Sequence, residues 1–224
     1  MGGRVVAEAK HLTFFYADAQ GGRAEHPALE DVNLAIEAGS VTALIGPSGC
    51  GKTTLCKCLT GVIPKLTPGR LTGEVFVDGR EIAGDGSATI GSLSERVGFV
   101  LQEPDHQIVM TTAEDDVAFG PENLMRPPRE IRASVDAILS DMGLEGKEEV
   151  SPSRLSGGEK QRLAVCGALA MGPEAMVFDE PTSNLDAAGK AHFVRLVKAL
   201  RDMGKTVVVV EHDFEIFDFA DRWT

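Results

Sequence analysis

The sequence lacks a long hydrophobic run. Unbroken apolar stretches such as "VVVV" at 207–210 fall far short of the roughly 18 to 20 residues that a membrane-spanning helix needs. We therefore expect that the chain does not cross a bilayer by itself. No charged and then apolar leader precedes the first strand-like segment, so the expected compartment is a reducing cytosol.

Cysteine is scarce too. The four cysteines, at positions 50, 56, 58 and 166, form neither a secreted disulfide framework nor the paired spacing of a zinc site. Cys56 and Cys58 lie two positions apart on a predicted helix, where they point to different faces. We interpret both as packing residues and not as metal ligands.

Clusters of basic residues are absent, and the formal net charge is −12. A broad electrostatic footprint on DNA or RNA needs clustered Lys and Arg, so we expect no nucleic-acid partner. Nucleotide binding stays open, because a phosphate site is built from local backbone N–H groups and one lysine and tolerates an acidic surround.

Apolar residues are plentiful: 43% of the 224 residues are hydrophobic, which predicts a single globular α/β domain over 1–224. Residues 4–16 and 28–38 alternate as antiparallel strands do, and 71–82 combines two strands with an Asp-Gly turn, as in a hairpin. Continuous apolar runs are typical of parallel strands buried on both faces. Such runs occur at 41–46, 97–101, 175–179 and 206–211.

Strand signals disappear between 103 and 155, where we predict an inserted helical subdomain. One helical face before Gly143 collects the apolar residues Ile131, Val135, Ile138, Leu139 and Met142. A second amphipathic helix, with apolar residues between 193 and 200, ends at Gly204 and leads into the strand at 206, as a βαβ crossover does. The expected fold is a mostly parallel sheet with an N-terminal antiparallel β subdomain and an inserted α-helical subdomain.

"GPSGCGKTT" at 46–54 satisfies G-x-x-x-x-G-K-[ST] between a predicted strand and a predicted helix. In such a loop, backbone N–H groups converge on the phosphates, Lys52 supplies charge and the Thr53 hydroxyl ligates Mg²⁺. A glycine turn with a chance lysine is the alternative, but the context favours ATP or GTP binding by a P-loop NTPase core. The residues expected at the nucleotide are Gly46, Pro47, Ser48, Gly49, Cys50, Gly51, Lys52, Thr53 and Thr54.

"AMVFDEPTSNLD" at 175–186 ends a buried strand with two adjacent carboxylates, which is costly unless each has a partner. Asp179 is placed to hold Mg²⁺, and Glu180 to polarise an attacking water. Alternatively, the pair only caps the next helix, with Pro181 at its start.

"LSGGEKQR" at 155–162 begins another predicted helix. Ser156 and Glu159 have the spacing of a capping box. The box does not explain Gly157 and Gly158, each of which costs roughly 1 kcal/mol relative to alanine inside a helix. We infer that something approaches this backbone closely, although a stretch without a following lysine is a poor nucleotide site on its own.

These motifs, in this order and with a His after a late apolar strand, resemble the nucleotide-binding subunits of ABC transporters over residues 4–224. The resemblance implies an ABC ATPase fold that binds ATP and Mg²⁺, with Glu180, Gln102 and His212 as catalytic residues. Gln102 would contact Mg²⁺ or water and sense a membrane partner, and His212 would contact the γ-phosphate. Outside the family, a glutamine or histidine after a strand would carry no such meaning.

The resemblance also implies the remaining contacts. The Mg²⁺ ligands would be Thr53, Gln102 and Asp179. Tyr16 would stack on adenine, although Phe14 and Phe15 are close enough to leave the choice open, and one of the three is expected in the core.

A second ATPase subunit, identical or different, would complete the site. Asp186 matches a loop that passes across the dimer interface. Ser156, Gly157, Gly158 and Glu159 would close over the γ-phosphate held by the partner. Many relatives have Gln where this chain has Glu159, and the effect of that difference stays open.

A narrower resemblance, carried by "QEPDHQIVMTTAEDDVAFGPENL" at 102–124 and "CGALAM" at 166–171, is to the ATPases of energy-coupling-factor (ECF) importers of vitamins, cobalt and nickel. In that group the helical subdomain forms a groove for a coupling helix. The expected partners are a membrane coupling subunit and a substrate-binding membrane subunit, at the cytoplasmic face of the cell membrane. Alternatively, Glu114, Asp115 and Asp116 only suit a helix N-terminus.

Other classes of function fit the sequence less well. ABC-type ATPases of DNA repair have a long coiled coil in the interval between Lys52 and Asp179, where this chain has no sustained heptads. A translation-associated ABC ATPase and another importer class stay open, whereas a small-molecule kinase explains the phosphate loop but not "LSGGEKQR" or Gln102. The chain stops at Thr224, soon after His212, so we expect a truncated end or half of a longer protein. The transported substrate is not readable, because a separate membrane subunit selects it in this family.

Overall fold

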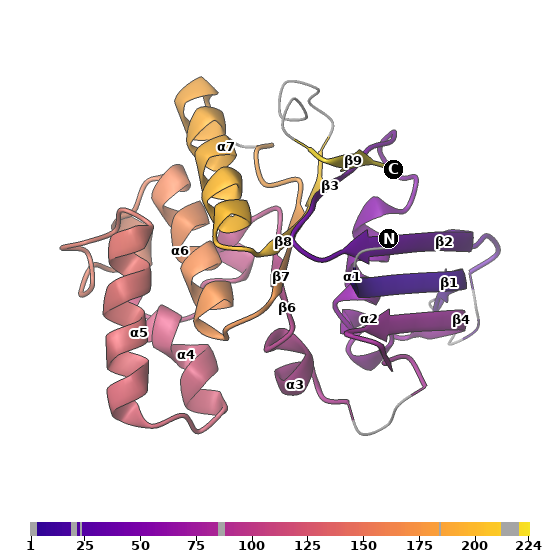
Figure 1. Cartoon of the computed structure of the whole chain (residues 1–224), viewed down its shortest axis with the longest axis horizontal. Coiled ribbons are helices and arrows are strands. Elements are labelled where there is room, and N and C mark those ends of the chain that lie inside the picture. Colours follow the sequence, from indigo (N-terminus) through magenta and orange to yellow (C-terminus); the bar gives the residue numbers. More distant parts are fainter. Residues whose placement is uncertain (1–3, 19–21, 23, 85–87, 184, 212–219) are drawn as a thin grey trace.

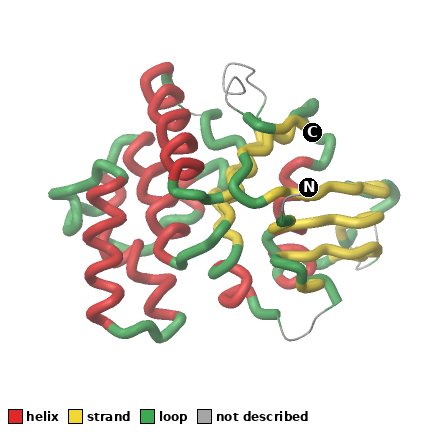
Figure 2. The backbone as a smooth tube through the Cα atoms, viewed as in Figure 1, coloured by secondary structure: helices red, strands yellow, loops and turns green. Residues whose placement is uncertain are grey.

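The computed structural model describes residues 4–18, 22, 24–84, 88–183, 185–211 and 220–224. An antiparallel sheet, a parallel sheet and a group of helices lie side by side, with the parallel sheet in the middle (Figure 1). Figure 2 shows the same arrangement, with the antiparallel strands at one end of the molecule and the long helices at the other. The predicted α/β fold with two kinds of sheet is confirmed.

The antiparallel sheet comes from the N-terminal part of the chain and has the strand order β2-β1-β4-β5. Its strands are β1 (Val5–Tyr16), β2 (Leu29–Glu37), β4 (Gly69–Val77) and β5 (Arg80–Glu81). Asp78 and Gly79 join β4 to β5 with φ angles of 51° and 73°, the left-handed conformations that a tight hairpin turn requires. Both predicted antiparallel strands and the hairpin are confirmed.

The parallel sheet has the strand order β6-β7-β8-β3-β9. Its strands are β3 (Val41–Leu44), β6 (Val97–Val100), β7 (Ala175–Asp179), β8 (Thr206–Val210) and β9 (Arg222–Trp223). Every residue of β3, β7 and β8 is buried, as the continuous apolar runs predict. Because neighbouring strands run in the same direction, their carboxyl ends meet at one edge of the sheet.

Three helices, α4 (Ala113–Asn123), α5 (Pro128–Asp141) and α6 (Gly157–Ala170), pack against one another, and α6 also contacts β6. The others are α1 (Lys52–Leu59), α2 (Val62–Lys65), α3 (Ile90–Ser94) and α7 (Ala187–Asp202), with 3₁₀ turns at Pro104–His106 and Pro152–Arg154. Residues 103–155 contain helices and no strand, so the helical prediction there is confirmed. Within the described part of the chain, no helix has the length and apolar character needed to cross a membrane.

Alternation along the parallel strands divides the buried apolar residues between two cores. Val177 and Val208 belong to the core under the antiparallel sheet, together with Leu59 of α1. Phe178 belongs to the core under the helices, where it packs edge-on against Phe193 of α7 with ring centroids 5.2 Å apart. The parallel sheet is therefore covered on both faces, which fixes its position in the middle of the molecule.

Three cysteines lie in these cores. Cys56 and Cys58 are fully buried in the first core, which confirms their interpretation as packing residues, and Cys166 is fully buried in the second core. Helix α1 contacts β1, β4 and β7, so residues on different faces of it are buried together. Burial raises the pKa of Cys58 to about 12 and that of Cys166 to about 12, so both thiols stay protonated.

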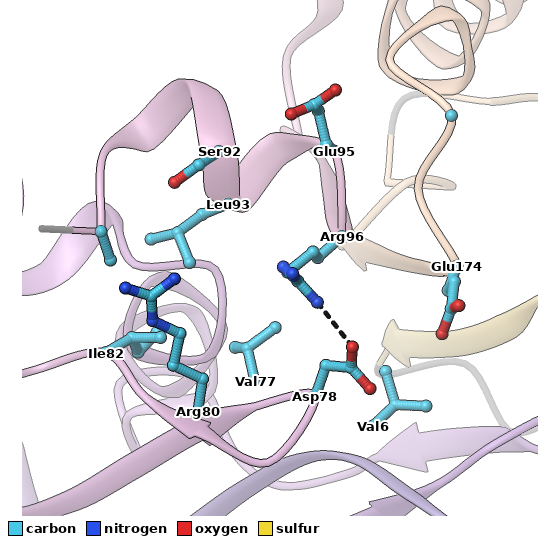
Figure 3. Close-up of a pocket in the computed structure, with 12 residues that line it drawn as sticks. Val6, Val77, Asp78, Arg80, Ile82, Ser92, Leu93, Glu95, Arg96 and Glu174 are labelled. Atoms are coloured by element: carbon cyan, nitrogen blue, oxygen red, sulfur yellow. Dashed lines mark hydrogen bonds and ion pairs between the residues drawn. The ribbon is translucent and has the colours of Figure 1, made fainter. Parts of the chain in front are cut away.

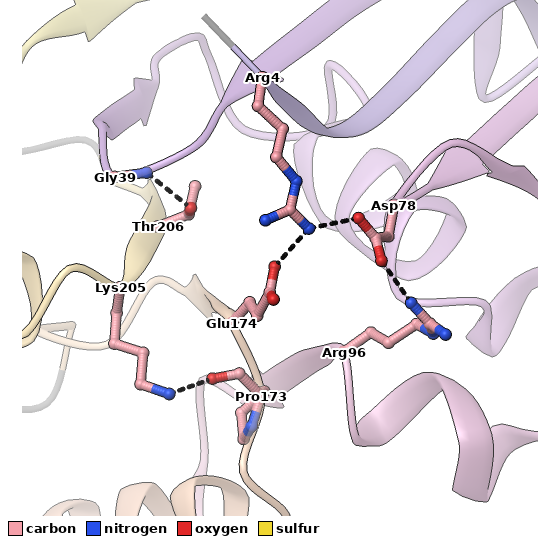
Figure 4. A network of polar contacts seen from close by, with 8 residues as sticks. All are labelled: Arg4, Gly39, Asp78, Arg96, Pro173, Glu174, Lys205 and Thr206. Atoms are coloured by element: carbon pink, nitrogen blue, oxygen red, sulfur yellow. Dashed lines mark hydrogen bonds and ion pairs between the residues drawn. The ribbon is translucent and has the colours of Figure 1, made fainter.

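An ion-pair network joins the two sheets at the amino ends of the parallel strands (Figure 4). The Arg4 guanidinium contacts Asp78 and lies 2.8 Å from a Glu174 carboxylate oxygen, and Arg96 donates to Asp78 at 2.5 Å. Beside it lies a cavity of about 360 Å³, into which Leu93 of α3 projects (Figure 3). Arg96 precedes β6 and Glu174 precedes β7, so both lie at the amino edge of the parallel sheet. The network therefore links the two sheets at this edge and leaves the opposite, carboxyl edge free.

Candidate functional site

Four polar segments meet at the carboxyl edge of the parallel sheet. Three of them were predicted from the sequence, and the fourth was not. The phosphate loop follows β3, Gln102 follows β6, Asp179 and Glu180 end β7, and Glu211 follows β8. The strand order β6-β7-β8-β3 brings these segments together although they are far apart in the sequence. In open α/β sheets, ligands bind at this edge. His212 lies outside the described residues.

The phosphate loop is shaped by the residues packed beneath it. Gly51 has a φ of 103°, and a Cβ there would lie 2.5 Å from the Ala28 carbonyl oxygen and 2.9 Å from the Leu29 Cδ2 atom. Only glycine fits such a position. Helix α1 starts at Lys52 with no side-chain cap, so its first N–H groups stay available to an anion at the loop.

Lys52 is held inside this loop. Its side chain is buried, and the ammonium donates to the carbonyl oxygens of Gly46 at 2.8 Å and Pro47 at 3.0 Å. The Cys50 sulfur lies 3.8 Å away. The positive charge therefore sits among the loop's own backbone groups, where phosphate oxygens can replace the carbonyls as acceptors.

Thr53 and Asp179 join the phosphate loop to the end of β7. The Thr53 hydroxyl donates to the Asp179 carboxylate across 2.9 Å. Burial is the largest effect on the pKa of Asp179 and raises it, while the hydrogen bond from Thr53 acts in the opposite direction. A hydroxyl and a carboxylate are oxygen ligands of the kind that Mg²⁺ prefers, so this pair fits the predicted metal role.

Glu180 and Gln102 also lie side by side at this edge of the sheet. The Gln102 side-chain amide lies 3.2 Å from a Glu180 carboxylate oxygen and 3.5 Å from the Ser183 hydroxyl. Glu180 has a φ of 46°, an uncommon conformation for a residue other than glycine, while its N–H donates to the Val210 carbonyl at 3.0 Å. The turn after β7 therefore points this side chain away from the strand direction, toward Gln102.

The alternative in which Asp179 and Glu180 only cap the next helix is wrong. Helix α7 begins at Ala187, and its cap is Asp186, whose carboxylate accepts from the Gly189 N–H at 2.7 Å. Capping is thus the role that the structure gives to Asp186. The predicted position of Asp186 at a dimer interface stays a prediction.

Of the three aromatic candidates, Phe14 is the core residue, because it is fully buried. Tyr16 is half-buried, packs edge-on against Phe14 with centroids 5.0 Å apart, and its hydroxyl lies 3.0 Å from that of Thr54. Tyr16 is therefore tied to the helix that follows the phosphate loop. Stacking on adenine stays a prediction for Tyr16.

The signature stretch, residues 155–162, forms the predicted capping box at the start of α6. The Glu159 N–H donates to the Ser156 hydroxyl at 3.4 Å, and the Ser156 N–H donates to the Glu159 carboxylate at 2.8 Å. A Cβ on Gly157 would meet nothing within 4 Å, and one on Gly158 would meet only the end of the Arg162 side chain, at 3.9 Å. Packing among the described residues therefore gives no reason for either glycine.

Sequence reasoning missed Glu211. This carboxylate is buried and accepts from the Thr182 N–H at 3.0 Å and from the Thr182 hydroxyl at 2.5 Å, so it ties the segment after Glu180 to the end of β8. The sequence pattern that indicated Asp179, a carboxylate at the end of a buried apolar strand, also occurs at Glu211 and could have indicated it.

Side chains of the segment 102–124 have structural partners of their own. The Gln107 amide accepts from the Leu101 N–H at 3.0 Å and donates to the Phe99 carbonyl at 3.1 Å, which completes the end of β6. Asp116 is buried and accepts from the Val109 and Met110 N–H groups at 2.8 and 3.0 Å. Asp116 therefore shapes the loop before α4, which a simple acidic helix start does not explain.

The sequence of this chain matches a known protein family. The profile of the family described as ABC transporter matches residues 29–183, which include the phosphate loop, Gln102, the signature stretch and Asp179. The chain belongs to the ABC transporter family. Among ABC transporter proteins it is 41% identical over 220 residues to the energy-coupling factor transporter ATP-binding protein EcfA1 of Symbiobacterium thermophilum, covering 97% of this chain and 74% of that protein. Both predicted resemblances are confirmed.

Two solved ABC transporter proteins share the fold. The structure of cbiO1 from Clostridium perfringens, described as part of the ABC transporter complex cbiONQ, has a TM-score of 0.79 at 31% identity and covers 95% of this chain and 80% of that one. A dimeric structure of the ATP-binding cassette MJ0796 bound to ADP and Pi has a TM-score of 0.81 at 30% identity, covering 97% and 92%.

Some ABC transporter relatives are much longer. The chain spans 32% to 37% of the length of four curated Methanosarcina proteins, each named putative ABC transporter ATP-binding protein and 41% to 43% identical to it.

Proposed function

We propose that this chain is the ATP-binding and ATP-hydrolysing subunit of an ECF-type importer of a vitamin or of a metal ion such as cobalt or nickel. The observation that carries the proposal is the convergence of the phosphate loop, the Thr53 and Asp179 pair and the Gln102 and Glu180 pair at one sheet edge. The 41% identity to EcfA1 of S. thermophilum supports the importer class. Residues 1–224 would act as one ATPase domain.

In this proposal, the N–H groups of the loop and of α1 bind the phosphates of ATP, and the Lys52 ammonium moves from its carbonyl acceptors to the β- and γ-phosphate oxygens. Tyr16 stacks on adenine. Thr53, Asp179 and Gln102 would hold Mg²⁺, which neutralises phosphate charge when it is bound.

Hydrolysis is an in-line attack of water on the γ-phosphorus. Glu180 orients and polarises that water, and the Gln102 amide holds the Glu180 carboxylate in place. Lys52 and His212 stabilise the charge that spreads over the γ-phosphate oxygens. The bond to the β-phosphate oxygen breaks, and ADP and phosphate leave.

A second ATPase subunit completes each site. Ser156, Gly157, Gly158 and Glu159 lie at the positive end of α6, and the backbone at the two glycines is open to an approaching phosphate. The dimeric arrangement of MJ0796 with ADP and Pi supports such pairing. Asp186 would lie at the same interface.

The partner in the membrane is a coupling subunit, with a separate substrate-binding membrane subunit, so the protein is peripheral at the cytoplasmic face. A cavity of about 310 Å³ with a largely apolar lining opens between α2, α3, β6, α4 and α6. Residues of its wall include Val62, Ile90, Val109, Phe119, Ala168 and Met171. Because Val109 and Phe119 are 63% and 43% exposed, they offer an apolar contact surface for a coupling helix. We expect no nucleic-acid partner, because the formal net charge is −12.

The test is to purify the full-length protein from membranes in mild detergent and to identify the proteins that accompany it. A hydrophobic coupling subunit is the expected companion, and ribosomes in its place would support the translation-associated alternative. Phe119→Asp should reduce that co-purification by about tenfold or more, because a charge enters a desolvated contact. Met203→Asp, which changes an exposed residue at the end of α7, is the matched control and should leave the complex intact.

A further inference from the structure

Glu159 brings a carboxylate to the turn that would face a triphosphate. One of its oxygens accepts from the Ser156 N–H at 2.8 Å and lies 2.9 Å from the Ser156 hydroxyl. The other oxygen contacts the Lys147 ammonium. Both oxygens are therefore used within the chain, and the charge of Glu159 is paired with a residue outside the signature stretch.

Lys147 is fixed on the turn that follows α5. Two backbone hydrogen bonds join this turn to the start of α4: the Ala113 N–H donates to the Val150 carbonyl at 3.1 Å, and the Glu114 N–H donates to the Glu148 carbonyl at 2.9 Å. The Lys147 side chain thus links the start of α4 to the start of α6. It is 37% exposed and Glu159 19% exposed, so the pair is partly shielded from solvent.

The charge of Glu159 persists at working pH. Its contact with Lys147, and then its hydrogen bonds with the Ser156 N–H and hydroxyl, lower the pKa of Glu159 to about 2. A proton therefore does not neutralise the carboxylate at neutral pH. A cation beside it can offset its repulsion of a triphosphate that approaches the same turn.

The first turn of α6 divides its N–H groups between two uses. The capping box engages the N–H groups of Ser156 and Glu159. Gly157 and Gly158 lie between them, in the first turn, where a helix has no internal acceptors for its N–H groups. The box therefore fixes the turn, while the N–H groups of the two glycines have no acceptor within the helix.

We propose that Lys147 is a positioning residue of the shared ATP site: it neutralises Glu159 and holds the capping box so that Gly157 and Gly158 can receive the γ-phosphate of ATP bound to the second subunit. The inference rests on the proposed function, because it needs a second subunit paired through ATP. The proposal explains how the signature stretch can contain a glutamate where glutamine would carry no charge. Lys147, which belongs to the inserted helical segment, neutralises the charge of Glu159.

The test is a double-mutant cycle in the full-length chain, with Glu180→Gln present throughout to block hydrolysis. The parent of the cycle is the chain with Glu180→Gln alone. Sedimentation at increasing concentrations of ATP and Mg²⁺ measures pairing by this parent, by Lys147→Met, by Glu159→Gln and by the double variant. We expect Lys147→Met to weaken pairing about twofold to thirtyfold, the range of charge effects at helix ends, and Glu159→Gln to restore pairing in the double variant. Thermal unfolding checks that each variant is folded.

Lys160→Met is the matched control. Lys160 is the next residue along α6, but its ammonium donates to Asp105 at 2.6 Å and not to Glu159. Adding Glu159→Gln should therefore restore ATP-driven pairing to Lys147→Met and should not improve pairing by Lys160→Met. Lys147→Arg, which keeps the positive charge, should pair more strongly than Lys147→Met.

Three results would overturn the inference alone while the parent still pairs with ATP: normal pairing by Lys147→Met, a double variant as weak as Lys147→Met, or equal rescue of Lys160→Met. The outcome is different if the parent stays monomeric at every ATP concentration, both alone and with the ATPase that accompanies it in the membrane complex. That result would refute the proposed pairing, and the inference with it.

Discussion

The phosphate loop at 46–54 and the signature stretch at 155–162 are both glycine-rich starts of helices, yet their glycines have different causes. A Cβ on Gly51 would lie 2.5 Å from the Ala28 carbonyl oxygen, whereas a Cβ on Gly157 would meet nothing within 4 Å. Glycine at the first site is required by the chain's own packing. Glycine at the second site is required by nothing in the described chain, which is what a surface for an external phosphate would show.

The two stretches also differ in charge. The phosphate loop contains its own lysine, Lys52, whose ammonium lies among the loop carbonyls. The signature stretch contains Glu159, and the lysine that offsets it, Lys147, comes from the inserted segment. The positive charge of the first loop is therefore supplied within a few residues, whereas the charge balance of the second depends on a tertiary contact and, in our proposal, its function depends on a second subunit.

The largest expected effect concerns the chemistry of the nucleotide that the first loop would hold. Glu180→Gln should leave ATP binding intact and reduce turnover by a factor on the order of 10² to 10⁴, because it removes the group that polarises the attacking water. Steady-state ATPase rates and equilibrium ATP binding by the same preparations measure the two properties. Turnover equal to that of the wild type would remove Glu180 from the mechanism.

The next prediction compares the glycines directly. Gly51→Ala should weaken ATP binding by the single chain by about 10-fold to 100-fold, because strain at positive φ costs roughly 1 to 3 kcal/mol and the added carbon meets the Ala28 carbonyl. Gly157→Ala should change that binding less than about twofold, since its Cβ has room. Titration with a fluorescent ATP analogue gives both affinities. Equal losses in the two variants would erase the proposed difference between the loops.

A smaller, more selective effect is expected at Gly158. Gly158→Asp should preserve ATP binding by the monomer and prevent ATP-driven pairing, because the new carboxylate would meet the partner's triphosphate at the start of α6. Size-exclusion chromatography with and without ATP measures pairing. Persistent pairing by this variant would show that the signature stretch does not face the second nucleotide.

Much of the fold follows from local patterns. Runs such as "AMVFD" and "TVVVV" became strands buried on both faces, and the Asp78 and Gly79 turn formed the expected hairpin. The capping box of Ser156 and Glu159 formed because both residues lie in one turn. Such features depend on neighbours within a few positions, which a sequence displays directly.

Contacts between distant segments were not readable in the same way. The carboxylate pair at the end of β7 could have been a helix cap until Asp186 proved to occupy that role. Gln107 completes β6 through its side chain, and Glu211 binds Thr182. Each of these partners was a polar residue among many, and only the folded backbone selects which donor reaches which acceptor.

The sequence by itself determined the chemical repertoire: a phosphate loop with Lys52 and Thr53, a strand ending in Asp179 and Glu180, and a second glycine-rich helix start at Ser156. The tertiary structure alone decided how these parts combine. The parallel strand order places Gln102 against Glu180 and Thr53 against Asp179, and the inserted segment sets Lys147 against Glu159. The physical reason is the sequence distance over which each effect acts. Propensity and periodicity act among residues within one turn or one strand, whereas these hydrogen bonds and ion pairs join residues far apart in the sequence that only folding brings together.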